Sequence, residues 1–363
     1  MNKSPRSSIA SSPKPWGRIA LIAVSLLLVS CSGSWKQLYE AHMLVSETTP
    51  EVTDGTEVSI HWIGTAGLYV SDGRNGFFID PFVSRYGLLR VGLGLKLHPR
   101  EDLVEEWLER VGTREATHVL VSHSHYDHSM DAPAFARKTG AALVGSQSSL
   151  HIAEGAGLPA DQQVLAEPGV PFQAGDFTIT FLESRHGPAL FGRIPYPGEV
   201  EETLEPPVSA RAYRLGATYS LLIEHPSGTF VHHGSAGIVP GMFDDITADV
   251  VLLGIAGRSG TEEYVEDVVD ALEAERVVLL HFDNFFVPLD KPMRQLWSVK
   301  FKEFVTTTQA FRPALRLETL PLGERVVLLT GSPKQVSDAD EPAHQENMAE
   351  SAPVTAPTQA SGE

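Results

Sequence analysis

Short apolar runs separated by turn residues mark the start of the segment that is able to form a core. Three such runs cover residues 58–63, 67–70 and 76–79, and the segment "SDGRNG" separates the second run from the third. Glycine and asparagine adopt the left-handed backbone of tight turns at little cost. The pattern therefore predicts a hairpin-rich sheet in this part of the chain.

Helical spacing follows these strands. Leu103, Trp107, Leu108 and Val111 share one helical face behind an acidic first turn. The segment "THVLVSH" then predicts a buried strand that ends at His123. Strands that alternate with helices predict an α/β fold. The remaining predicted strands are 142–144, 177–182, 219–223, 229–233, 250–255 and 276–281, and the remaining predicted helices are 130–138, 261–275 and 293–308.

The beginning of the chain has the layout of a secretory signal. Residues 1–18 are basic and hold no acid, and residues 19–30 form the apolar stretch "IALIAVSLLLVS". A helix over that stretch would reach only about 18 Å, whereas a hydrocarbon core is about 30 Å thick. A signal peptide is therefore favoured over a permanent transmembrane helix.

The ending "LVSC" resembles a bacterial lipobox, which implies that Cys31 is lipidated and begins the mature chain. Ser32 follows where an aspartate would indicate retention in the inner membrane. We therefore expect a cell-envelope protein anchored in the outer membrane and facing the periplasm. The alternative is a free cysteine behind an ordinary signal peptide. The expected segments are a signal peptide over 1–30, a tether with one short helix over 31–56, a folded domain over 57–331 and a disordered acidic tail over 332–363.

Composition and charge narrow the class of partner. The chain has 363 residues, of which 42% are hydrophobic, so it is able to bury a large core. The formal net charge is −18. A surface this acidic repels the phosphates of nucleic acid. We therefore expect no nucleic-acid partner, and a small-molecule or lipid-like substrate instead.

The segment "VSHSHYDHSMDA" concentrates side chains that bind metals. His123 and His125 lie two residues apart and are able to point the same way from an extended segment. Asp127 and His128 follow one turn later and are able to face a neighbouring point. Imidazole and carboxylate ligands together suit zinc or another borderline divalent ion. The segment therefore predicts two halves of a metal site.

Two further histidines complete the candidate ligands. His186 in "LESRHGP" and His281 in "LLHFDN" both come at the ends of predicted strands. Loops that follow strand ends commonly gather into a site. We therefore expect these two histidines to close the coordination of the metal or metals.

The order His-x-His-x-Asp-His at residues 123–128 resembles the signature of the metallo-β-lactamase superfamily. The resemblance extends over about residues 58–329, and "IDP", which contains Asp80, resembles an early aspartate motif of that family. It implies an αβ/βα sandwich of two mixed sheets flanked by helices, with the metals at one edge. The branch most similar in spacing contains ascorbate-phosphate lactonases and N-acylphosphatidylethanolamine phospholipase D. The implied ligands are His123, His125 and His186 for one metal and Asp127, His128 and His281 for the other.

One position departs from that family pattern. Ser235 in "FVHHGSAG" stands where an aspartate usually bridges both metals. We therefore expect one or two zinc ions, or manganese or iron in their place, with the second site weaker than the first. Asp80, His232, His233 and Ser235 are candidates for hydrogen bonds that orient the ligands, although "IDP" is equally consistent with a simple turn and the adjacent histidines with packing.

The predicted chemistry is hydrolysis. A dication lowers the pKa of bound water to about 7 and supplies hydroxide for attack on an ester, lactone or phosphodiester bond. Asp127 would orient that hydroxide as the catalytic carboxylate. Two alternatives stay open, namely a catalytically degenerate metal-binding envelope lipoprotein and a mononuclear iron oxidoreductase. The insertions at 82–99 and 187–210 should border the metals, either as a simple cover or in contact with substrate.

Overall fold

The predicted hairpins open a seven-stranded sheet. The computed structural model describes residues 35–48, 54–189 and 192–331. In the first sheet the strand order is β17-β1-β2-β3-β5-β6-β7. Its first four strands pair antiparallel and its last four pair parallel, so the sheet is mixed. The strands are β1 Glu57–Gly64, β2 Gly67–Ser71, β3 Gly76–Ile79, β5 His118–Leu120, β6 Ala142–Gly145, β7 Gln163–Leu165 and β17 Arg325–Thr330.

A second, eight-stranded sheet has the order β13-β9-β11-β12-β14-β15-β16, with β8 paired to β9. β9 and β11 pair antiparallel, whereas β12, β14, β15 and β16 run parallel. Two short strands, β4 Lys96–Leu97 and β10 Val208–Ser209, form a separate pair. The strands of the second sheet are β8 Phe172–Ala174, β9 Phe177–His186, β11 Thr218–His225, β12 Gly228–His233, β13 Ala236–Gly237, β14 Val250–Gly254, β15 Arg276–Leu280 and β16 Arg316–Glu318.

Helices and turns connect and cover the two sheets. A helix over residues 35–41 comes first. Ser146 begins α6 by accepting a hydrogen bond from the amide of Ser149, and Gly140 ends α5 in the left-handed region at φ 73°. The other helical elements are α2 Leu88–Gly92, α3 Glu101–Arg110, α4 Tyr126–Ser129, α5 Ala132–Thr139, α6 Gln147–Gly155, η1 Ala160–Gln162, η2 Ala210–Ala212, α7 Thr261–Tyr264, η3 Val265–Asp270 and α8 Phe301–Phe311.

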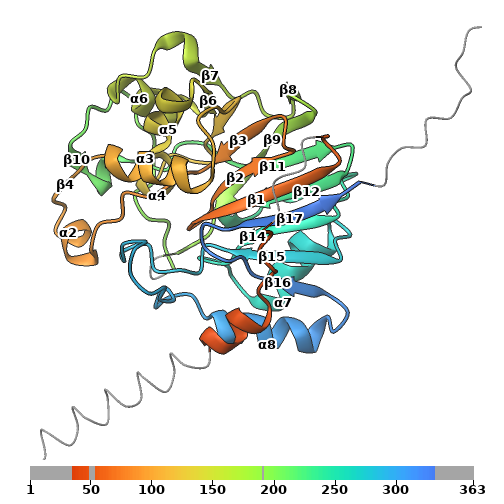
Figure 1. Cartoon of the computed structure of the whole chain (residues 1–363). Coiled ribbons are helices and arrows are strands. Elements are labelled where there is room, and N and C mark those ends of the chain that lie inside the picture. Colours follow the sequence, from red (N-terminus) through yellow and green to blue (C-terminus); the bar gives the residue numbers. More distant parts are fainter. Residues whose placement is uncertain (1–34, 49–53, 190–191, 332–363) are drawn as a thin grey trace, which may run out of the picture. The chain divides into compact units, whose positions relative to one another are not determined.

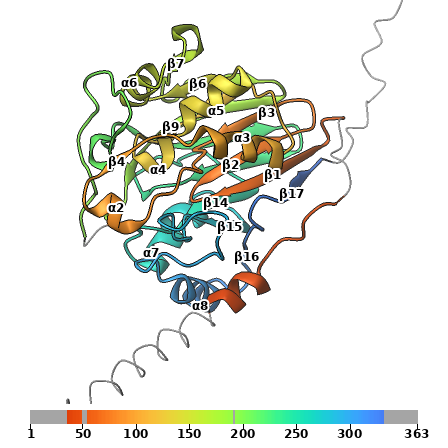
Figure 2. The ribbon, with the colours of Figure 1, turned by 60° about the vertical axis from the view of Figure 1, so that its left-hand side comes forward.

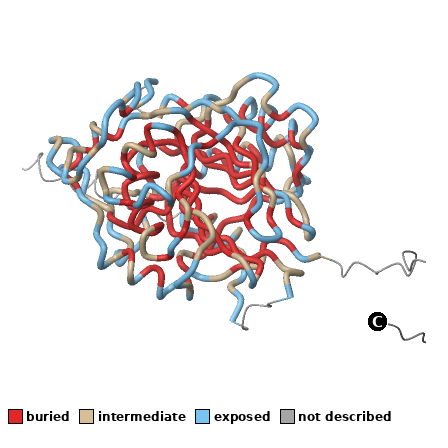
Figure 3. Tube along the Cα trace, turned by 90° about the horizontal axis from the view of Figure 1, so that it is seen from above, coloured by how far each residue is buried: buried red, intermediate tan, exposed pale blue. Residues whose placement is uncertain are grey.

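The sheets face each other across the main core. Alternating residues of β1 to β3, such as Trp62, Leu68 and Phe77, point toward the second sheet, whereas Ile63 and Phe78 point outward beneath α3 and α5. Figures 1 and 2 show α3, α5 and α6 outside the first sheet and α7 and α8 beside the second. The buried trace fills the centre of Figure 3. Two mixed sheets flanked by helices confirm the predicted fold class.

The predicted tether differs from the structure where that segment is described. Trp35 and Tyr39 are buried in the main core, and the Tyr39 hydroxyl donates a hydrogen bond to the carbonyl of Leu320 at 2.7 Å. Residues 35–44 therefore pack on the domain, because their aromatic side chains gain more from burial than from solvation. The predicted signal peptide, Cys31 and the predicted tail lie outside the described residues.

Two predicted helices are shorter in the structure. Residues 261–275 form α7 and then one wide turn that ends at Asp270. The segment expected to be helical from residue 293 becomes helical only at Phe301. Before that, Asn284 and Leu296 donate backbone hydrogen bonds between the segments 282–284 and 294–296, and this pairing competes with the helix. In the part of the chain that the structure describes, no helix combines the length and apolarity needed to cross a membrane.

Candidate metal centre

The candidate ligands gather where strands of both sheets end. His123 and His125 lie in the loop after β5, and the short helix α4 carries Asp127 and His128. The second sheet contributes His186, the last residue of β9, and His281, which directly follows β15. The sequence motif and the strand ends indicated these side chains, which are spread over residues 123–281. The fold brings them together.

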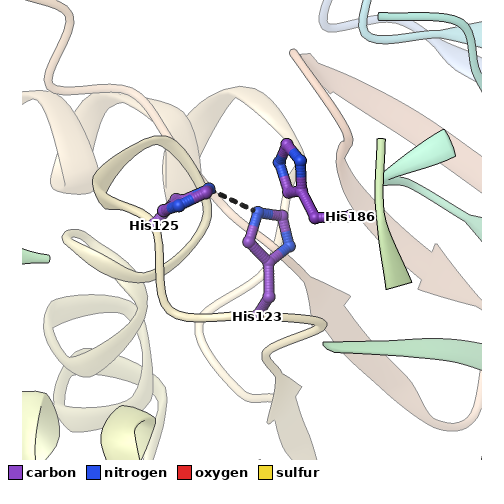
Figure 4. A group of neighbouring side chains, drawn as sticks. All are labelled: His123, His125 and His186. Carbon is purple, nitrogen blue, oxygen red and sulfur yellow. Dashed lines mark hydrogen bonds between the residues drawn. The ribbon is translucent and has the colours of Figure 1, made fainter. Parts of the chain in front are cut away.

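The six side chains form two groups of three. Ligand atoms of His123, His125 and His186 lie within 4.8 Å of one another, and those of Asp127, His128 and His281 do so as well. Figure 4 shows the three imidazoles of the first group turned toward one another. The closest nitrogens are Nε2 of His123 and Nδ1 of His125 at 3.1 Å, and in the second group Nε2 of His128 and Nε2 of His281 at 3.2 Å.

Hydrogen bonds on the outer ring nitrogens orient the imidazoles. His125 donates from Nε2 to the carbonyl of Pro195 at 2.8 Å, and His186 donates from Nδ1 to the carbonyl of Gly187 at 2.7 Å. His128 donates from Nδ1 to Oδ2 of Asp80 at 2.9 Å. Each donation leaves a lone pair on the nitrogen that faces the other ligands. Neutral imidazoles oriented in this way fit a divalent ion of the zinc type.

Asp80 connects the two groups. It is fully buried at the end of β3, and its φ of 43° lies in the left-handed region. Its Oδ2 accepts hydrogen bonds from His128 and from the Ser122 hydroxyl at 2.5 Å, and that hydroxyl lies 3.2 Å from Nδ1 of His123. Asp80 thus contacts one ligand of the second group directly and one of the first group through Ser122. The alternative that "IDP" is only a strand-ending turn would not explain why this carboxylate is buried and connected to both groups.

The electrostatics keep most of the ligands neutral. Burial, followed by the neighbouring imidazoles, lowers the pKa of His123 well below its ordinary value. Burial likewise lowers the pKa of His125 to about 4 and that of His186 to about 3. The first group therefore presents free lone pairs over a wide pH range, as a metal ion requires.

The second group carries charge. Burial opposes ionisation of Asp127, but His128 and His281 outweigh it and hold the pKa of this carboxyl below its ordinary value. Burial also lowers the pKa of His128, but Asp80 and Asp127 outweigh it and raise the pKa overall. A metal entering this group therefore competes with protons for His128 more than a metal entering the first group competes for its histidines.

A buried ion pair supports His281, and the sequence motifs gave no sign of it. The amide of His281 donates to the carbonyl of Thr65, and the amide of Thr65 donates to Oδ1 of Asp283 at 2.9 Å. Arg85 binds Oδ2 of Asp283 at 2.6 Å, and both side chains are less than 5% exposed. Only the fold reveals this support, because Arg85 and Asp283 are 198 residues apart.

The three other predicted positions differ in their contacts. Nε2 of His232 lies 3.0 Å from the carbonyl of Ala66, and Nδ1 of His233 lies 2.6 Å from the Ser220 hydroxyl. Both rings are fully buried and neither belongs to a ligand group. Ser235 donates to the carbonyl of Arg185 at 3.2 Å and lines the cavity beside the ligands. Packing and hydrogen bonding account for the two histidines.

An open-sided cavity of about 830 Å³, counting its solvent-filled mouth, adjoins both groups. The predicted insertions border it through Val91, Pro195 and Tyr196, and the segment after His281 adds Phe285 and Trp297. Its lining is mainly apolar apart from the ligands, Ser235 and Ser298. The hydroxyl of Tyr126 is buried there without a hydrogen-bond partner among the described residues.

A third group lies away from this cavity. Asp72, Asp176 and His225 also bring oxygen and nitrogen atoms within 4.8 Å of one another. The amide of Ser227 donates to Nδ1 of His225, so the neutral ring carries its proton on Nε2, 3.6 Å from Asp72. Arg74 lies 3.2 Å from Asp176. This ring has no free lone pair for a metal, and ordinary polar contacts account for the group.

Solved structures with similar arrangements include two metalloproteins. Igni18, a metallo hydrolase from Ignicoccus hospitalis, is 20% identical, with a TM-score of 0.49 over 75% of this chain and 98% of that chain. CmlA, a diiron β-hydroxylase from Streptomyces venezuelae, is 14% identical, with a TM-score of 0.48 over 78% of this chain and 55% of that chain.

Sequence comparison identifies the family. A protein of Pyrobaculum islandicum described as a UPF0173 metal-dependent hydrolase is 25% identical over 234 residues, which cover 63% of this chain and 85% of the relative. A Myxococcus xanthus protein with the same description is 31% identical over 173 residues, or 46% of this chain and 56% of the relative. Residues 77–282, more than half of the chain, match the profile of the Beta-lactamase superfamily domain. The chain therefore belongs to the beta-lactamase superfamily.

Proposed function

We propose that this metal-dependent hydrolase of the beta-lactamase superfamily cleaves an ester, lactone or phosphodiester bond. One observation carries the proposal. Two groups of three metal-type ligands lie side by side, and both open into one cavity. Relatives described as metal-dependent hydrolases support the same reaction class. A protein with only a structural metal would need one closed ligand group and no adjoining cavity.

The metal ligands and Asp127 have different roles in the proposed reaction. A divalent ion held by these ligands would lower the pKa of bound water to about 7 and polarise the bond under attack. Asp127 is ionised at neutral pH, because its pKa lies below the ordinary value, and it borders the cavity. Its carboxylate is therefore placed to accept a hydrogen bond from the attacking water and to pass the proton toward the leaving group.

Zinc is the proposed ion, with the first group filled more tightly than the second. Three buried imidazoles of lowered pKa support tight binding by His123, His125 and His186. The second group binds protons more readily, because, against the effect of burial, Asp80 and Asp127 raise the pKa of His128. It also has Ser235 nearby instead of a carboxylate, and a neutral hydroxyl attracts two dications less than a shared carboxylate does.

The cavity supports a substrate with an apolar body. Among the described residues that line it, none is lysine or arginine, whereas Phe285, Phe286 and Leu296 contribute apolar surface. A substrate with several negative charges would find no counter-charge there apart from the metals. An acyl ester, a lactone or a lipid-like phosphodiester fits better, because its apolar part is desolvated while the reacting group faces the ligands.

We also propose that the protein is held in the cell envelope by lipid on Cys31, at the outer membrane and facing the periplasm. The support is the order of the basic segment, the apolar segment and "LVSC". Changing Cys31 to alanine should leave an uncleaved or soluble form. A variant that still fractionates with membranes at the normal size would remove this part of the proposal.

Activity tests the hydrolase proposal directly. Natively purified protein would be analysed for metal content and then assayed on nitrophenyl esters, lactones and bis-nitrophenyl phosphate. We expect turnover of at least one class, loss of that turnover after chelation, and recovery when zinc is returned. Protein that holds metal but hydrolyses none of these substrates would favour the degenerate metal-binding alternative, and an iron-dependent absorption band would favour the oxidoreductase.

A further inference from the structure

Four leucines are exposed on one short segment beside the cavity. Leu88, Leu89, Leu93 and Leu95 are 53%, 76%, 65% and 49% exposed. They belong to residues 86–98, here called the leucine loop, which contains α2 and β4. An exposed leucine cluster of this kind typically marks a surface that contacts a membrane or a partner.

The leucine loop holds a defined conformation that turns these side chains outward. Val91 and Leu97 are buried in a small core with Phe82 and Tyr126. Arg90 donates from its guanidinium to the carbonyl of Lys96, β4 pairs with β10, and Arg211 donates to the carbonyl of Gly92. Inward and outward positions are therefore fixed by packing on one side of the loop. The exposed leucines do not result from a lack of structure.

The charge around the leucine loop is opposite to that of the whole chain. The chain has a formal net charge of −18, yet residues 82–100 contain no acid. Arg90 and Lys96 are exposed within the loop. Acids resume at Glu101 and Asp102 in the first turn of α3, where Asp102 forms an ion pair with Arg100. Exposed leucines flanked by cations fit the boundary between headgroups and acyl chains of an anionic bilayer.

The leucine loop also borders the cavity mouth. Val91, the buried residue of α2, lines the cavity together with Trp297, which is 60% exposed. Figures 1 and 2 both place α2 at the same edge of the domain as the segment that follows β15. A tryptophan at a cavity rim suits the water–lipid interface, because its ring is apolar and its N–H is polar. A lipid surface at this edge would meet the entrance directly.

We propose that the leucine loop inserts into the surface of an anionic lipid bilayer and turns the cavity mouth toward it. This contact is separate from any lipid on Cys31 and does not depend on hydrolysis. The four leucines enter the boundary between headgroups and acyl chains. Arg90 and Lys96 stay at the level of the phosphates. A substrate with an acyl chain would then reach the ligands without crossing water.

Fluorescent labelling of the full chain tests the insertion. Cys31 is the only cysteine, so a Cys31→Ser background accepts one probe at Leu89→Cys or, as the matched control, at Val164→Cys on β7. Both positions are exposed. With phosphatidylcholine–phosphatidylglycerol vesicles we expect brominated lipids to quench the probe at residue 89 but not the one at residue 164. Equal quenching, or none at residue 89 on vesicle-bound protein, would overturn the proposal.

A second substitution tests whether the leucines themselves drive the insertion. Leu93→Glu in the Leu89→Cys background should abolish the quenching, whereas Val170→Glu, at another exposed position, should leave it unchanged. The rate of hydrolysis of a water-soluble substrate should be the same in both variants. A failure of the insertion proposal is therefore distinguishable from a failure of the proposed function. A probe at residue 89 that becomes buried without vesicles, as protein concentration rises, would instead identify a second copy of the chain as the partner and contradict insertion.

Discussion

Oδ2 of Asp80 accepts a hydrogen bond from Nδ1 of His128 at 2.9 Å, and the same oxygen accepts the hydroxyl of Ser122, which contacts His123. One buried carboxylate therefore orients a ligand in each group. Such a contact raises the basicity of the ligating nitrogen and fixes its direction. The two groups consequently depend on the same residue although they share no ligand.

Asp80→Asn should weaken metal binding at both groups. Asparagine tolerates the left-handed backbone at this position, but its amide nitrogen is unable to accept the bonds from His128 and Ser122. We expect affinity to fall roughly 10- to 100-fold, measured by competition with a chelator. Asp131→Asn is the matched control, because Asp131 is equally buried but bonds to the amides of Val83 and Ser84 and to the Ser84 side chain instead of to a candidate ligand. Equal losses in the two variants would contradict the role of Asp80.

Arg85→Met should destabilise the fold and loosen His281. It leaves Asp283 buried without its cation, a change that typically costs about 3–5 kcal/mol of unfolding free energy. Because Asp283 holds Thr65, and Thr65 holds the amide of His281, the second group should lose metal before the first. Urea unfolding and metal titration measure the two effects. Arg312→Met, which breaks an exposed pair with Asp270, should cost less than about 1 kcal/mol. An equal loss of unfolding free energy in Arg312→Met would show that burial does not explain the contribution of the Arg85–Asp283 pair.

Asp131 predicts a pH-dependent contribution to stability. Burial raises the pKa of this carboxyl from 3.8 to about 6 in the folded protein. The folded state therefore binds more protons than the unfolded state between these values, and stability is lost as the pH rises through the folded pKa. The shift of the Asp131 pKa from 3.8 to about 6 corresponds to a loss of unfolding free energy on the order of 3 kcal/mol.

Asp131→Asn should remove this dependence while an amide oxygen still accepts the bonds from Val83 and Ser84. Urea unfolding of both proteins at about pH 4.5 and about pH 7.5 gives the difference, in which other titrations cancel. The variant should be more stable relative to the wild type at the higher pH than at the lower pH. A difference that stays constant with pH would mean that the carboxyl is not desolvated in the folded state.

Ser235→Asp should raise the metal content toward two ions per chain. Ser235 lines the cavity with ligands of both groups, so a carboxylate there would be close to both ions. Elemental analysis after mild chelation measures the change, with Ser298→Asp on the same lining as the control. Wild-type protein that retains two ions under the same chelation would contradict the weaker second group.

The local sequence indicated which side chains come together, because their spacing reflects local geometry. His123, His125, Asp127 and His128 occupy one loop and one turn of helix, and His186 and His281 come at strand ends that any α/β sheet collects at one edge. Asp80 was a candidate because "IDP" resembles the early aspartate motif of the family.

Contacts between distant segments were not predictable from the sequence. The support of His281 by Arg85 and Asp283 depends on two loops that meet only in the folded chain. The segment after residue 293 has helical spacing, but its backbone pairs with residues 282–284 instead. Trp35 and Tyr39 lie in a polar segment, and nothing local indicates that the core has room for them. In each case tertiary packing overrides local preference.

The central claim is that the metal ligands carry out hydrolysis, and paired substitutions within one loop test it most directly. On whichever substrate is turned over, Asp127→Asn should lower kcat roughly 10²- to 10⁴-fold while most of the metal remains, because Asp127 positions the attacking water. His125→Ala should lose both metal and turnover, because it removes a ligand of the tighter group. Wild-type turnover in both variants would show that these ligands are not the catalyst.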